Sequence, residues 1–135
     1  MEYGNPSFGH TRRLPGWTFG DAVQATRDAL ATQGFGVLTE IDVEATLKKK
    51  LDVDMPHYVI LGACNPPFAH QALSAMPGIG LLLPCNVVVA EEEGAIAVST
   101  IDAREMFKVV DLPEVAPIAE QVNERLEKAL AAIGA

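Results

Sequence analysis

Two short stretches hold the residue types most able to do chemistry: "GACNPPFAH" at residues 62–70 and "LLPCNVVV" at residues 82–89. Each contains one of the chain's two cysteines, and each cysteine is followed by asparagine and lies beside proline. A thiol is a nucleophile, a redox group and a soft metal ligand. An asparagine amide both donates and accepts hydrogen bonds. We therefore predict a site at Cys64, Asn65, Cys85 and Asn86.

The backbone settings of the two cysteines differ. Cys64 is predicted to end a strand just before a helix that Asn65 caps, where free N–H groups and the helix dipole favour a thiolate. Cys85 follows Pro84, which interrupts a predicted strand and can redirect a side chain into a cleft. The apolar flanking residues equally suit two cysteines that only fill the core. The residues leave both interpretations open.

Two kinds of chemistry remain open for these thiols: catalysis or redox exchange, and metal binding. Cys64 or Cys85 can serve as a catalytic nucleophile or redox group, because a histidine partner needs only to be adjacent in space. Together with His70 they form a possible soft metal site for zinc or monovalent copper. The spacing contains no C-x-x-C pair, and His70 lies about a turn and a half into its helix. The sequence has no dinucleotide-binding, P-loop or zinc-protease motif.

Hydrophobic periodicity predicts the elements that position this site. Thr18 and Gly34 bound the first long helix as cap residues, and Asp111 with Pro113 opens the last. Helices are predicted at 18–34, 44–51, 65–76, 102–107 and 111–133, and strands at 8–14, 35–43, 57–64, 78–90 (broken at Pro84) and 95–101. Long amphipathic helices with a mainly antiparallel sheet indicate one α+β domain over residues 1–135.

Composition excludes several partners. The chain has 49% hydrophobic and 21% charged residues, as in ordinary globular proteins, and its formal net charge is −8. An acidic surface repels phosphate backbones, so we expect no nucleic-acid partner. No apolar run approaches the roughly 20 residues of a membrane span, and the first residues lack a secretory signal pattern. We therefore expect a cytoplasmic protein with reduced thiols and no membrane partner.

Three motifs in order, "EIDVEATLKKKLDVD", "YVILGACNPPFAHQAL" and "GLLLPCNVVV", resemble the domain-of-unknown-function 302 family, in a subgroup with a Cys-Asn-Pro step. The resemblance covers about residues 19–107; the C-terminal amphipathic helix, about 112–133, is less diagnostic. It implies a curved antiparallel sheet packed against helices and a homodimer. It also implies that no biochemical activity is established.

Three functions follow from these observations. The first is a small binding module that holds a small ligand or a soft metal ion at Cys64, Asn65, Cys85 and Asn86. The second is a thiol-dependent enzyme or redox protein that uses Cys64 with Cys85. The third is a structural or assembly protein whose cysteines only pack. The sequence alone does not choose among them.

Overall fold

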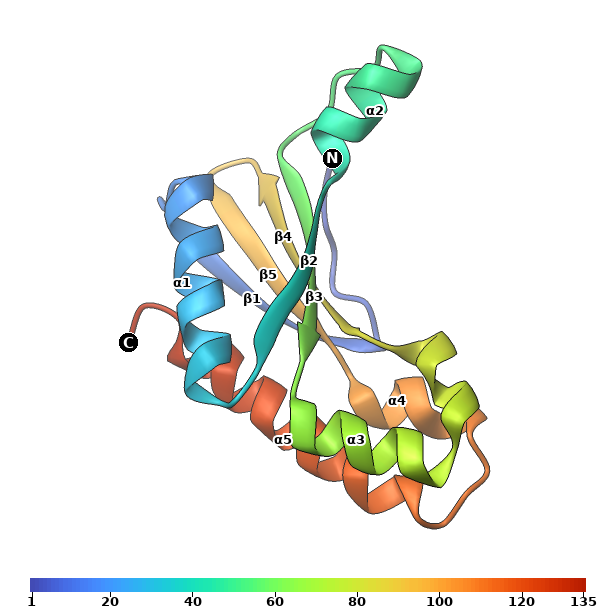
Figure 1. Ribbon diagram of the computed structural model, residues 1–135. Coiled ribbons are helices and arrows are strands. Elements are labelled where there is room, and N and C mark those ends of the chain that lie inside the picture. The colour runs from blue at the N-terminus through green and yellow to red at the C-terminus, as the bar shows by residue number, and fades with distance from the viewer.

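The computed structural model describes residues 1–135 as an open, five-stranded antiparallel sheet beside several helices (Figure 1). The strand order is β1-β5-β4-β3-β2, so β3 and β4 lie next to each other inside the sheet. The strands are β1 (Gly9–Pro15), β2 (Gly36–Asp42), β3 (Tyr58–Cys64), β4 (Cys85–Glu92) and β5 (Ala95–Ile101). The predicted α+β class is confirmed.

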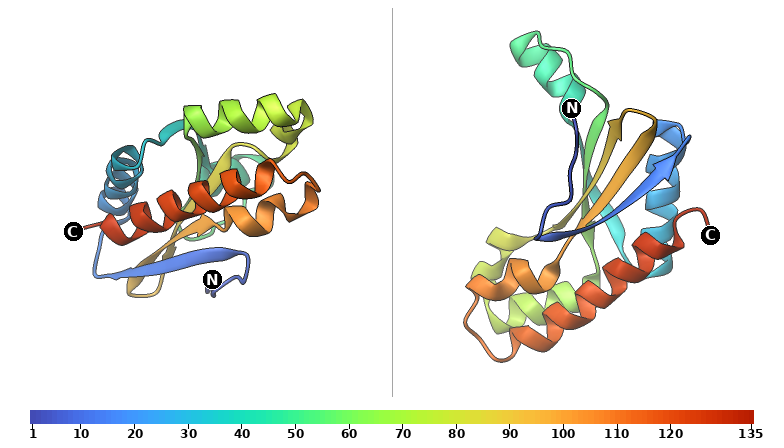
Figure 2. Two further views of the ribbon diagram at one scale, coloured as in Figure 1. Left: turned by 90° about the horizontal axis from the view of Figure 1, so that it is seen from below. Right: turned by 180° about the vertical axis from the view of Figure 1, so that it is seen from behind.

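Two long helices cover one face of the sheet, and shorter elements gather beyond one end of it (Figures 1 and 2). The helices are α1 (Phe19–Thr32), α2 (Val43–Leu51), α3 (Pro66–Ala75), α4 (Ala103–Met106) and α5 (Val115–Ala132), with two 3₁₀ turns, η1 (Pro77–Leu82) and η2 (Phe107–Val109). α1 and α5 pack on the sheet, whereas α3, α4 and η1 lie at the end where β3 finishes and β4 begins. The structure contains no helix that is both long and apolar enough to span a bilayer.

Local sequence explains where several elements begin and end. Thr18 caps α1 by accepting a hydrogen bond from the Asp21 N–H at 3.2 Å, and Gly34 follows the helix with a positive φ of 83°. Asp102 caps α4 in the same way, through the N–H groups of Arg104 and Glu105. The predicted ends of these helices are confirmed.

Two predicted elements are wrong in their bounds. The strand predicted over 78–90 begins only at Cys85, because the preceding Pro77–Leu82 segment forms η1. Its proline and glycines are poor strand residues, and Pro84 has no N–H for a ladder. The last helix begins at Val115 instead of near Asp111, with Glu114 at its N-cap position. The C-terminal helix therefore starts a few residues later than its capping signals suggest.

The edge strand β2 pairs with β3 and leads into α2, which projects away from the sheet, and we call this stretch the projecting arm (Figure 1). It comprises residues 36–57, which include α2, and none of these residues is buried. Next to the body, the β2 register shifts between Val37 and Thr39, so Leu38 is an extra residue in the strand. Such a bulge bends a strand and redirects a side chain. Here it turns Leu38 toward the end of the sheet where α3 begins.

Candidate functional site

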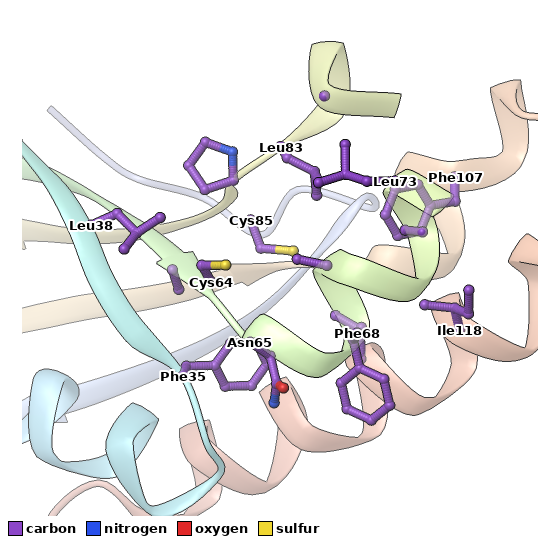
Figure 3. A pocket seen from close by; sticks show the side chains of 16 residues that line it. Phe35, Leu38, Cys64, Asn65, Phe68, Leu73, Leu83, Cys85, Phe107 and Ile118 are labelled. Carbon is purple, nitrogen blue, oxygen red and sulfur yellow. The ribbon is translucent and has the colours of Figure 1, made fainter. Parts of the chain in front are cut away.

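An apolar cavity of about 290 Å³ lies at this end of the sheet, between β3, α3, η1 and α5 (Figure 3). Its walls come from segments far apart in the sequence. They are Phe35, Leu38, Ala63, Cys64, Asn65, Phe68, Ala69, Ala72, Leu73, Gly80, Leu83, Pro84, Cys85, Phe107, Ile118 and Val122. None of these residues carries a charge, and only the two thiols and the Asn65 amide are polar side chains.

The β3–β4 pairing brings the two cysteines into this cavity. Ala63 is the direct partner of Cys85 across the two strands, so Cys64 is one residue away from direct pairing. Successive side chains normally alternate between the faces of a sheet. β3 ends at Cys64, however, and the chain turns there into α3, so both sulfurs point into the same cavity (Figure 3).

The two thiols differ in exposure. Cys64 is half-buried, whereas Cys85 is 5% exposed and belongs to the hydrophobic core. Burial, and to a lesser extent the neighbouring Cys64, raises the pKa of the Cys85 thiol from 9.0 to about 12. Cys85 is therefore a neutral thiol at physiological pH, and Cys64 is the sulfur that a solvent-borne reagent can reach.

Asn65 lies at the N-cap position of α3, but its side chain makes no capping hydrogen bond. Its Nδ2 instead donates to the backbone carbonyl of Gln33 at 3.1 Å and ties the end of α1 to the start of α3. Gly34 permits this contact, since a Cβ there would lie 3.2 Å from Nδ2 in a positive-φ residue. The predicted capping role of Asn65 is wrong, because its amide is held by the neighbouring turn.

The N–H groups expected to favour a thiolate at Cys64 are also fewer than predicted. Pro66 and Pro67 occupy the first two positions of α3, and proline has no backbone N–H. Two of the donors that make a helix N-terminus attractive to anions are therefore missing. The prediction that free N–H groups surround Cys64 fails for these two positions, and the cavity is left with an apolar character.

Asn86 and His70 do not join the other predicted site residues. Asn86 pairs with Gly62 and is exposed on the opposite face of the sheet, in a groove under the N-terminal segment. The alternation of side chains along β4 separates it from Cys85. His70 is exposed on α3 and does not line the cavity. No group of three His, Cys, Asp or Glu residues is placed to hold a metal ion.

Comparison with known proteins agrees with the fold. Residues 10–133 match the model of a family described as "Domain of unknown function DUF302". The chain belongs to the DUF302 family. The fold resembles the crystal structure of an uncharacterized conserved DUF302 protein from Bacillus stearothermophilus, with a TM-score of 0.86 and 26% identity over 95% of this chain and 99% of that one. No curated protein matches.

The DUF302 match extends beyond the predicted core of residues 19–107 at both ends. It includes α5, which contributes Ile118 and Val122 to the cavity. The sequence interpretation missed these two residues, together with Phe35 and Phe107, as site residues. Their apolar side chains suit burial, but the sequence pattern does not reveal that they surround a space.

A cluster of polar side chains lies away from the apolar cavity. The buried Asn123 side chain accepts hydrogen bonds from His10 Nε2 at 3.1 Å and from the Ala103 N–H at 3.3 Å, and it donates to Glu127 at 3.2 Å. Each end of the amide is therefore used. This cluster joins β1, α4 and α5, and we interpret it as a structural connection.

Proposed function

We propose that this DUF302 protein is a binding module for a small, uncharged and mainly apolar molecule, which it holds in the cavity beside Cys64. The observation that carries this proposal is the absence of any charged residue among the walls of a cavity that opens beside a half-buried thiol. A charged ligand would lose its hydration there without gaining an ionic partner. The soft metal ion considered from the sequence has only two sulfur ligands here and is the less supported occupant.

The volume supports a ligand of modest size. An engineered apolar cavity of about 150 Å³ stays dry and binds benzene. The cavity here is about 290 Å³, which suits a molecule of roughly two aromatic rings or a short aliphatic chain. Asn65 supplies one polar contact, because its Nδ2 is occupied by Gln33 while its Oδ1 makes no hydrogen bond within the protein. One hydroxyl or N–H on the ligand would match it.

The direct test is titration with N-phenyl-1-naphthylamine, an uncharged dye that fluoresces in apolar surroundings. Ala69 lines the cavity and Ala75 lies on the same helix without lining it. We expect Ala69→Phe to fill the cavity and to weaken dye binding by at least about tenfold, as overfilling an apolar site removes its contacts. Ala75→Phe, which adds the same side chain to an exposed position, is expected to bind as the unmodified protein does.

Circular dichroism of both variants ensures that lost binding is not lost folding. Equal dye affinity for the two phenylalanine variants would contradict the proposal. So would a preference for an anionic dye of the same ring system, because the cavity offers no cation to receive it.

We also propose that the protein is cytoplasmic, because free thiols such as those of Cys64 and Cys85 stay reduced in the cytoplasm.

We further propose a homodimer formed through the projecting arm. A nine-residue helix is marginal in water unless its apolar face packs, yet α2 has no buried residue. Leu51 is 67% exposed and Ile41 is 49% exposed. β2 is also an edge strand with one unpaired side.

Light scattering after size exclusion tests this assembly. Leu51→Glu is expected to yield monomers, because a charge at a covered apolar position repels the second copy. Leu81 is 94% exposed and lies outside the arm, so Leu81→Glu is the matched control and is expected to leave the dimer intact. A monomeric unmodified protein, or two variants of equal mass, would contradict the arm as an interface.

A further inference from the structure

The cavity contains two thiols and almost no other polar group, which is an arrangement that the binding proposal does not use. Cys64 and Cys85 are 21 positions apart, and only the pairing of β3 with β4 brings them together. Neighbouring strands lie about 4.8 Å apart and rise about 3.4 Å per residue. A residue one step from direct pairing is therefore about 6 Å away, Cα to Cα, and this lies within the range of disulfide-bonded cysteines, about 4.4–6.8 Å.

The geometry points to a dithiol site that undergoes thiol–disulfide exchange with small disulfides whose substituents are uncharged and apolar. Cys64 is the attacking group and Cys85 is the resolving group. The assignment follows from position, because Cys64 is half-buried at the cavity wall and Cys85 lies behind it in the core. The preference for uncharged substituents rests on the proposed apolar binding function; the pairing of the two sulfurs does not.

The exchange balances without any further reactant. The Cys64 thiolate attacks one sulfur of the substrate R–S–S–R, forms a mixed disulfide and releases the first RS⁻, which takes up the proton that Cys64 lost. Cys85 then loses its proton to solvent and attacks Cys64 Sγ, which forms the Cys64–Cys85 disulfide and releases the second RS⁻. Two thiols are oxidised, and one disulfide is reduced to two thiols.

The two steps are expected to have very different rates. Burial, and to a lesser extent the neighbouring Cys64, raises the pKa of Cys85 to about 12, so very little of Cys85 is a thiolate at pH 7. The mixed disulfide on Cys64 therefore accumulates before Cys85 resolves it. The rate of the second step is expected to rise about tenfold for each pH unit until it approaches that pKa.

The probes are two aromatic disulfides that release coloured thiols: dithiodipyridine, which is uncharged at neutral pH, and dithiobis(nitrobenzoate), which carries two carboxylates. Each rate on the full-length protein is divided by the rate on free cysteine. We expect this ratio to be at least about tenfold higher for dithiodipyridine, because carboxylates would be desolvated in the cavity without a partner. Two thiols are released per protein, in a fast and a slow phase, and the final mass lacks two hydrogens and carries no adduct.

Two variants assign the phases. Cys85→Ala is expected to release one thiol and to keep a stable adduct, and Cys64→Ala is expected to lose the fast phase. Unmodified protein that retains two adducts and never loses two hydrogens would overturn the pairing. Equal normalised rates for the two reagents would overturn the substrate class. Failure of dye binding while the two-thiol stoichiometry holds would count against the binding function and leave the exchange chemistry standing.

Discussion

The folded protein is expected to lose stability as the pH rises above 9. Replacing Cys85 with alanine is expected to make this loss smaller. In the folded protein the pKa of this thiol rises from 9.0 to about 12, mainly through burial. Below pH 9 both states are protonated and the group has no effect. Above pH 9 the unfolded chain releases the proton while the folded chain keeps it, so stability falls as pH rises. At about 1.36 kcal/mol per pKa unit, the loss is about 2 kcal/mol at pH 10.5 and approaches about 4 kcal/mol at pH 12.

Urea unfolding of reduced protein at pH 8 and at pH 10.5 measures this effect. Cys85→Ala costs stability at both values because it leaves a small cavity, but the difference between the two pH values should shrink by about 2 kcal/mol. Tyr58, whose pKa is also raised by burial, is present in both proteins and cancels. Cys64→Ala keeps Cys85 buried and should retain most of the decline. Parallel losses in Cys85→Ala and the unmodified protein would refute the reasoning.

Two further substitutions test how the cavity is held. Asn65→Leu is expected to cost about 1–2 kcal/mol in urea unfolding, because the Gln33 carbonyl loses its hydrogen-bond donor. The control Asn86→Leu, on the exposed face, should change stability by less than about 0.5 kcal/mol. Equal effects would show that the Asn65 contact is not needed. Gly62→Ala would press a Cβ against the side chains of Thr39 and Pro84, so we expect a loss of about 1–3 kcal/mol, and an unchanged melting temperature would contradict this close approach.

Of the four residues that the sequence placed in one site, three line the same cavity and one lies elsewhere. Cys64, Asn65 and Cys85 line one cavity, as predicted, but the match required the β3–β4 register, which local sequence does not specify. Asn86 could have been excluded from the sequence itself. Adjacent residues in a strand face opposite sides, so a strand that directs Cys85 inward must direct Asn86 outward. The Cys-Asn pair repeats in the sequence but not in the structure, because the two asparagines have different surroundings.

The walls of the cavity show what hydrophobic periodicity cannot predict. Phe35, Phe107, Ile118 and Val122 are apolar residues of predicted elements, and each is packed in the structure. Periodicity reports which face of an element avoids water, but it gives no measure of whether opposing faces meet or leave a space. The cavity results from the way α3, α5 and η1 meet beyond the end of the sheet. That arrangement depends on long-range packing.

The distribution of charge connects the cavity to the chemistry of its thiols. Residues 58–90 contain no Asp, Glu, Lys or Arg, although the whole chain has 28 such residues, and they supply most of the cavity walls. A lysine or arginine in the cavity wall would stabilise a thiolate at Cys85 and attract anions. Without one, burial keeps Cys85 protonated and the cavity neutral. The same absence of charge therefore slows the second thiol and selects an uncharged ligand, so a single Ala69→Lys substitution should alter both properties together.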